Sequence, residues 1–206
     1  ERPARLPIAS VIPIAEQIEA YLAEIPAAQR FSGAGSLRRV REMIKDIDFI
    51  IATEAPAEVR EALLTMDGVK DVVASGDSKV SVTIEAVYDI NVDYRLVAPE
   101  EFATTLHHFT GSTEHNIAMR QIAKSRGEKI NEYGVEQEET GDILTFNSEV
   151  EFFNHFNLPY IPPELREDTT DLNQLLNQEL DFIQLSDIRG DLHVHSTWSD
   201  GAQSIE

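Results

Sequence analysis

GSLRRVREMIKDID, residues 35–48, contains the pattern from which the rest of the fold can be worked out. It ends on two aspartates, Asp46 and Asp48, with one apolar residue between them. In a β-strand, residues i and i+2 lie on the same face, so the two carboxylates share one side. The apolar residues that alternate with these aspartates and continue after them then point into a core, and their burial fixes the register. They are Ile47, Phe49 and Ile51. Residues 46–53 are therefore predicted to form a strand with one acidic and one apolar face.

A second alternating stretch, residues 90–97, carries a third carboxylate. Asn91, Asp93 and Arg95 would share one face of this strand, opposite an apolar face. If the two strands are neighbours, Asp93 joins the aspartate pair, and three such charges repel one another unless a cation lies among them. Mg²⁺ favours carboxylate oxygens together with substrate phosphates, and two such ions can support phosphoryl transfer. An Asp-x-Asp pair alone is more often a plain solvent-exposed face.

The residues before the aspartate pair favour phosphate binding. Gly35 and Ser36 follow a short predicted strand and open a turn, which can present backbone N–H groups and a hydroxyl to a phosphate. Arg38 and Arg39 add guanidinium groups, which bind phosphate oxygens more specifically than lysine does. A phosphate-binding turn beside an acidic metal site is the equipment of a nucleotidyltransferase.

The remaining pattern predicts an α/β (α+β) protein in two parts. Residues 1–100 are expected to form a unit with a mixed sheet, and residues 101–188 a smaller helical unit with a hairpin and a C-terminal linker. Residues 189–206 begin a new strand, which is expected to be the edge of a further domain. Helices are predicted at residues 13–25, 56–66, 99–108, 112–126 and 148–156, and further strands at 30–35, 69–74, 79–87, 129–133 and 142–146.

Composition narrows the class of protein. The chain has 206 residues, no cysteine, and no apolar run that approaches the roughly 20 residues of a membrane span. No signal-peptide pattern opens it, so a cytoplasmic protein without membrane contact is predicted. The net charge of −20 argues against a general nucleic-acid surface. However, basic residues gather in two short segments, which suits local anion sites: Arg38, Arg39, Arg41 and Lys45, and Arg120, Lys124, Arg126 and Lys129.

Several ordered motifs resemble the X family of DNA polymerases, the polymerase beta superfamily. Residues 35–48 resemble its palm signature, and VDYRLV at 92–97 the strand with its third carboxylate. HFTGS at 108–112 and INEYG at 130–134 are similar to the palm–thumb junction and the thumb hairpin. LPYIPPELR at 158–166 resembles the bacterial branch, and DLHVHSTWSDG at 191–201 the start of that branch's PHP domain. The resemblance implies a nucleotidyltransferase-type palm and a small helical thumb.

The resemblance also implies roles for single residues. Asp46 and Asp48 would ligate two Mg²⁺ or Mn²⁺ ions, and Asp93 the ion that activates the primer 3′-hydroxyl. Gly35, Ser36 and Arg39 would hold the triphosphate. Arg5 would add a contact, with a disordered terminus as the alternative.

On one helix face, Asn116 would touch the nascent base and Arg120 the template, and Lys124 continues that face. Arg95, Glu132 and Tyr133 would form hydrogen bonds that switch as the thumb closes, with a structural ion pair as the alternative. His193, His195 and Asp200 match the first PHP metal motif and would be inert without further ligands.

Three residues depart from the family pattern. Lys45 stands where many members have glycine, and Asn91 replaces an arginine near the primer terminus. His108 replaces the tyrosine beside the nucleotide sugar, which puts discrimination against ribonucleotides in doubt. None of the three removes a predicted metal ligand.

The expected function is therefore gap-filling DNA repair by a DNA-directed DNA polymerase core, with gapped or primer–template DNA and a dNTP as partners. Two alternatives stay open. One is another nucleotidyltransferase of the same fold, and the other is a catalytically weak DNA-binding or scaffold fragment. The oligomeric state cannot be read from the sequence.

Overall fold

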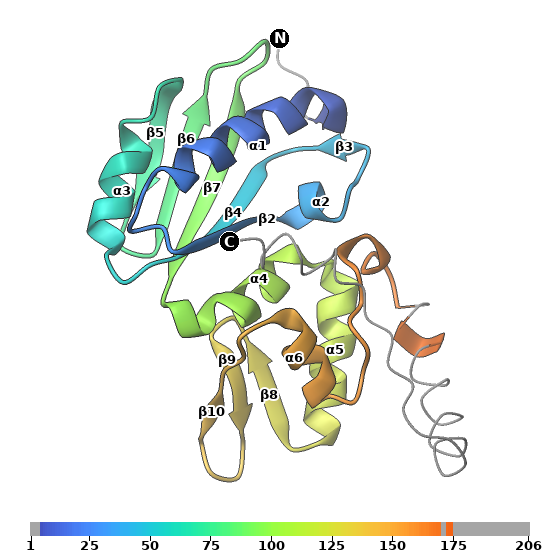
Figure 1. Ribbon diagram of the computed structural model, residues 1–206. Coiled ribbons are helices and arrows are strands. Elements are labelled where there is room, and N and C mark those ends of the chain that lie inside the picture. The colour runs from blue at the N-terminus through green and yellow to red at the C-terminus, as the bar shows by residue number, and fades with distance from the viewer. Residues whose placement is uncertain (1–4, 170–171, 175–206) are drawn as a thin grey trace.

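The computed structural model describes residues 5–169 and 172–174 of the chain (Figure 1). The predicted fold class is confirmed: a mixed sheet with helices is followed by a smaller part built from helices and a short antiparallel sheet. Residues 189–206, where a PHP domain was expected to begin, lie outside the described residues. Among the residues that the structure describes, none of the helices combines the length and the apolar character that a bilayer crossing needs.

The first part is organised by a five-stranded sheet in the order β2-β4-β7-β6-β5. Only the central pair β4–β7 is parallel; the other neighbours are antiparallel. The period-2 alternation predicted β7 correctly as a strand with one buried face, because every second residue of β7 is buried. The strands are β2 (Arg30–Ala34), β4 (Ile47–Ala52), β5 (Val69–Ser75), β6 (Lys79–Ile84) and β7 (Ile90–Val97).

Helices cover both faces of β4. On the face of Phe49, α1 (Ile8–Ala23) and α3 (Pro56–Leu64) complete the main core, and Figure 1 shows α1 lying across the sheet. On the face of Asp48, the next two inward positions, Ile50 and Ala52, pack against α4 (Phe102–Thr110). One end of this second face is therefore closed by α4, whereas the carboxylate lies at the other end.

The first helix begins earlier than predicted. We expected it to start at Pro13, but α1 begins at Ile8 and Pro13 lies inside it. A proline in a helix removes one hydrogen bond, a cost that tertiary packing can outweigh. Here the buried stripe starts before the proline, with Val11 fully buried, and continues at helical spacing through Ala15, Ile18 and Leu22. Just before α1, β1 (Leu6–Pro7) pairs with β3 (Met43–Ile44).

The second part contains one strand more than predicted. β9 (Gly134–Gln137) lies between β8 (Glu128–Asn131) and β10 (Ile143–Leu144). At the β8–β9 turn, the Asn131 side chain accepts hydrogen bonds from the backbone N–H groups of Tyr133 and Gly134. A Cβ on Gly134 would lie 2.6 Å from the Leu144 carbonyl oxygen, so only glycine lets β10 approach. The remaining helices are η1 (Pro99–Glu101), α5 (Thr113–Ser125), α6 (Glu149–His155) and η2 (Pro163–Leu165).

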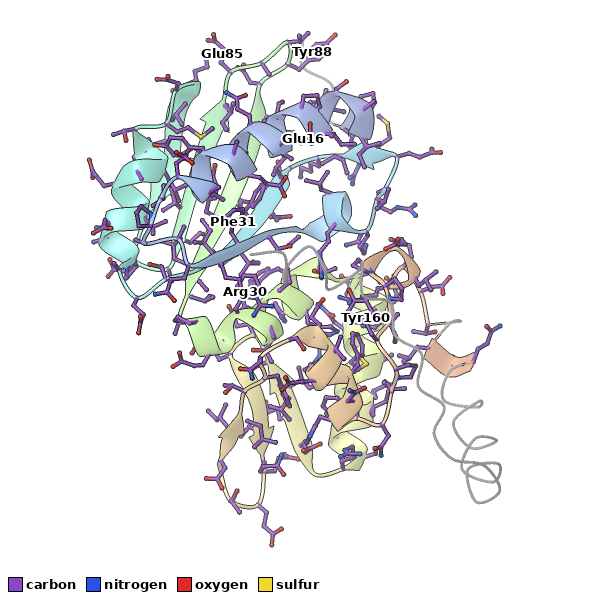
Figure 2. All side chains as sticks on the ribbon, in the orientation of Figure 1. Glu16, Arg30, Phe31, Glu85, Tyr88 and Tyr160 are labelled. Carbon is purple, nitrogen blue, oxygen red and sulfur yellow. The ribbon has the colours of Figure 1, made fainter. Side chains whose placement is uncertain are left out.

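The two parts are joined through α4 and by long side chains. α4 contacts β2 and β4 on one side and α6, β8 and β9 on the other. Arg30 lies at the border between the parts (Figure 2). Its guanidinium donates to the Asn147 carbonyl at 2.7 Å and lies 4.5 Å from the centre of the Phe102 ring. The predicted domain limits at residues 100 and 188 stay predictions.

The short helix α2 (Gly35–Arg38) ends in an unusual residue. The N–H of Arg41 donates to the carbonyl of Ser36, and the N–H of Val40 to that of Leu37, which is the Schellman pattern. Val40 occupies the position where this motif prefers glycine, with φ of 57°. A β-branched residue in the left-handed region is strained, and the Val40 side chain is 60% exposed, so it regains little by burial.

We expect Val40→Gly to raise the free energy of unfolding by about 0.5–1 kcal/mol. Relief of the left-handed strain contributes about 1–2 kcal/mol, and the greater freedom of glycine in the unfolded chain offsets part of it. Urea denaturation measures the change. Val73→Gly is the matched control, because Val73 is similarly exposed but lies in β5, where glycine weakens a strand. Equal destabilisation by both substitutions would contradict the expectation.

Candidate active site

The pairing of β4 with β7 brings two of the predicted carboxylates together. Asp48 and Asp93 are direct partners in the parallel register, and both are half-buried on the same face of the sheet. Asp46 immediately precedes β4, two residues before Asp48. The two carboxylate strands are therefore neighbours, which is the condition on which the predicted metal site depended.

The electrostatics of Asp48 reflect this crowding. Burial, and then the negative charges of Asp93 and Asp46, raise the pKa of Asp48 from 3.8 to about 7. Arg95 and Lys79 act in the opposite direction without cancelling the effect. A carboxyl whose ionisation is disfavoured by like charges is one that a cation would stabilise in its ionised form. The oxygen donors at this end of the sheet therefore fit a divalent cation.

The three aspartates do not form a closed ligand set. Within residues 5–169 and 172–174, no three Asp, Glu or His side chains are arranged so that they could hold a metal ion. The strand register brings Asp48 and Asp93 together, whereas Asp46 lies just before β4, where that register begins. The assignment of two ions to Asp46, Asp48 and Asp93 stays a prediction.

Ser81 belongs to the site and was missed by sequence reasoning. It is the β6 partner of Asp93, and its hydroxyl donates to the Asp93 Oδ1 at 2.6 Å. This bond fixes the orientation of the carboxylate. The available signal was a serine on the polar face of an alternating strand, a position that becomes informative only when its cross-strand partner is known.

Gly35 packs directly on the carboxylate of Asp48. Its φ is +63°, and a Cβ at this position would lie 2.4 Å from the Asp48 Oδ2. The predicted turn is therefore a close approach of the backbone to the acidic site, which also holds the Asp48 side chain in place. Ser36 follows at the start of the same helix and is half-buried.

Gly35→Ala is expected to lower the free energy of unfolding by at least about 2 kcal/mol, because it adds left-handed strain to a steric overlap with Asp48. Thermal unfolding measures the loss. Gly76→Ala is a suitable control, since a Cβ there meets nothing nearer than 3.7 Å and Gly76 has no left-handed φ. A Gly35→Ala protein as stable as the control would show that the Asp48 side chain moves aside freely.

The two arginines expected at a phosphate have different surroundings. Arg38 points into the protein: its side chain is 11% exposed and donates two hydrogen bonds to Glu149, at 3.0 and 2.7 Å, and one to the Thr110 hydroxyl. This differs from the expectation that both guanidinium groups face a phosphate. Arg39 is 15% exposed and contacts the Thr110 carbonyl and Glu167. Arg39 therefore remains the candidate for triphosphate binding.

Arg5 lies at the edge of the site. It is exposed and directly precedes β1, whose Leu6 is paired with Ile44 in β3. The antiparallel register puts Arg5 beside Lys45, one residue before Asp46. The alternative of a disordered terminus therefore does not apply to Arg5, which the structure describes. The phosphate contact of Arg5 stays a prediction.

The helix α5 carries the predicted DNA contacts. Arg120 and Lys124 are exposed, so they are accessible to a partner. Asn116 is half-buried, and its side-chain N–H donates to the His108 carbonyl at 2.9 Å. Its Oδ1 is buried and has no hydrogen-bond partner among the residues that the structure describes. Their assignment to the nascent base and the template stays a prediction.

A cluster around Phe109 links β7 to the β8–β9 turn. The guanidinium of Arg95 lies 4.4 Å from the centre of the Phe109 ring, and the His108 ring meets Phe109 edge-on at 4.7 Å. Burial lowers the pKa of His108, against the opposing charge of Glu132.

In the described part of the chain, no hydrogen bond joins Arg95, Glu132 and Tyr133, and Tyr133 is 50% exposed. The predicted thumb switch stays a prediction, as do the roles of His193, His195 and Asp200 in the part that is not described.

Comparison with known proteins adds a family context to this geometry. The family described as DNA polymerase beta thumb matches residues 105–167. The chain is 57% identical, over 100% of its length, to the DNA polymerase/3′-5′ exonuclease PolX of Bacillus subtilis (strain 168), and it spans 36% of the length of that protein. It is 27% identical over 138 residues to the repair DNA polymerase X of African swine fever virus (strain Badajoz 1971 Vero-adapted), covering 64% of this chain and 78% of the viral protein.

Proposed function

Since this chain belongs to the X family of DNA polymerases, we propose that it is the nucleotide-transferring core of a DNA-directed DNA polymerase that fills short gaps during DNA repair. The primer 3′-hydroxyl loses its proton to solvent, and its oxygen attacks the α-phosphorus of a dNTP. The bond from that phosphorus to the oxygen bridging the α- and β-phosphates breaks, and pyrophosphate leaves. The observation that carries the proposal is the side-by-side placement of Asp48 and Asp93 in the parallel strand pair.

The residues of the chain divide this work between them. Asp46 and Asp48 would hold both divalent ions, and Asp93 the one nearer the primer terminus. Bound Mg²⁺ or Mn²⁺ supplies charge neutralisation and a more acidic hydroxyl. Ser81 keeps the Asp93 carboxylate oriented through its hydrogen bond. Ser36 and Arg39 would bind the triphosphate, with Arg5 at the rim. The exposed face of α5 with Arg120 and Lys124 would contact DNA.

Extension of a primer across a one-nucleotide gap tests the proposal. With Mg²⁺, the chain is expected to add only the dNTP complementary to the template base, and EDTA is expected to abolish the addition. Addition that ignores the template base would favour another nucleotidyltransferase activity. DNA binding without extension would identify a DNA-binding fragment, and the unfinished ligand set of the described residues would then account for the missing chemistry.

A further inference from the structure

A carboxylate occupies the predicted phosphate-binding edge of Arg39. Glu167 accepts a hydrogen bond from the Arg39 Nε at 2.9 Å and approaches its Nη2 at 3.5 Å. The Nε of Arg41 lies 3.7 Å from the same Glu167 oxygen. Two guanidinium groups that are directed at one oxygen anion can bind a phosphate as well as a carboxylate.

The orientation of Arg39 is fixed from its other side. Its Nη1 donates to the Thr110 carbonyl at 2.6 Å. A Cβ on Gly111 would lie 3.1 Å from the same nitrogen, so the backbone fits closely around it. The edge formed by Nε and Nη2 is therefore the part of Arg39 left for an external anion, and it is the edge that Glu167 covers.

The backbone of Glu167 is held by contacts that do not depend on its side chain. The Ser112 hydroxyl donates to the Glu167 carbonyl at 2.8 Å, and the Ser112 N–H to the Arg166 carbonyl at 3.0 Å. The side chain of Glu167 is 36% exposed. It can rotate into solvent while the backbone stays in place. Glu149, the partner of Arg38, is fully buried and has no such freedom.

We propose that Glu167 is an internal competitor of the nucleotide: its carboxylate occupies Arg39 and Arg41 when no triphosphate is bound, and the triphosphate displaces it. The inference rests on the proposed function, because it assumes that Arg39 binds the triphosphate. It adds a residue that sets nucleotide affinity without contributing to the chemistry. The Glu167 carboxylate also offsets one of the two positive charges of Arg39 and Arg41 when no nucleotide is bound.

Equilibrium binding separates competition from a positioning role. The probes are dCTP and inorganic triphosphate, titrated calorimetrically into the full chain and into Glu167→Gln. We expect Glu167→Gln to bind both probes about two- to fivefold more tightly, the range that an exposed ion pair can supply. The gain should shrink as NaCl is raised, because exposed charges are screened. Glu164→Gln removes the same charge from an exposed position three residues away and should bind as the unmodified chain does.

The outcomes distinguish this inference from the proposed function. If the unmodified chain fills gaps but Glu167→Gln binds the probes equally or more weakly, the competition is overturned and the polymerase function stands. Weaker binding would make Glu167 a residue that positions Arg39. If neither protein binds dCTP or inorganic triphosphate, the triphosphate site itself is wrong, and the inference is overturned together with the proposed function.

Discussion

Asp93→Asn is expected to lower nucleotide addition by about a hundredfold to a thousandfold, because it removes a charged oxygen donor from the proposed metal site, whose cations would contribute several kcal/mol to the transition state. Asparagine keeps an acceptor oxygen for the Ser81 hydroxyl, so the strand pairing should survive. Single-turnover extension on gapped DNA measures the rate. Extension at the unmodified rate would remove Asp93 from the site.

The pH dependence of the free energy of unfolding, measured without metal, is an independent test of whether Asp93 lies beside Asp48. The folded state raises the pKa of Asp48 to about 7, above its ordinary 3.8, so folding favours the protonated form. That contribution is present at low pH and is lost as pH rises from about 3.8 to about 7. Asp93→Asn removes one cause of the shift. The variant should therefore lose less free energy of unfolding than the unmodified chain between pH 5 and pH 8, measured in EDTA.

Asp71→Asn is the matched control for both experiments. Asp71 is exposed on the edge strand β5, away from the β4–β7 pair. The control should change neither the extension rate nor the pH dependence of stability. An equal effect of both substitutions would mean that net charge, rather than the position of Asp93, decides the result.

The acidic part of the site could be predicted because strand geometry is local. A period of two puts Asp48 on the face opposite Phe49, and the same rule orients Asp93. The sequence left the pairing of the two strands as a condition, and the β4–β7 register of the structure meets it. The same rule failed for Ser81, since alternation within β6 does not reveal which residue of β7 lies opposite.

Contacts between distant segments were beyond the sequence pattern. Arg38 belongs to an arginine-rich stretch, so it resembles a phosphate ligand until its partner Glu149, 111 residues away, is known. The start of α1 was misplaced because a proline signal was weighted above a buried stripe that extends past it. β9 was overlooked because a glycine after the predicted strand 129–133 was read as its end. In the structure, Gly134 begins β9, and its lack of a Cβ lets β10 approach.

Glu149→Gln is expected to lower the free energy of unfolding by about 3–5 kcal/mol, as breaking a buried ion pair does. Glu149 lies between two arginines, with its oxygens 2.7 and 3.0 Å from Arg38 and 2.9 and 3.3 Å from Arg166. Arg166 is also fully buried. Glutamine would leave two guanidinium groups facing each other without a countercharge, and its amide nitrogen would offer a donor where an acceptor is needed. Urea denaturation at pH 7 measures the loss.

The pH dependence of stability gives this prediction its sharpest form. Burial alone would raise the pKa of Glu149, but Arg166 and Arg38 outweigh burial and hold it well below its ordinary 4.5. A lowered pKa contributes stability that is fully present above about 4.5 and is lost as pH falls below that value. The unmodified chain should therefore lose stability on acidification below pH 4.5 more steeply than Glu149→Gln. Glu151→Gln, at an exposed position of the same helix, should follow the unmodified chain. If the free energy of unfolding falls with pH in the same way for Glu149→Gln and Glu151→Gln, the arginine pair does not depend on the Glu149 carboxylate. The contact between the two parts of the chain would then rest on α4 and Arg30.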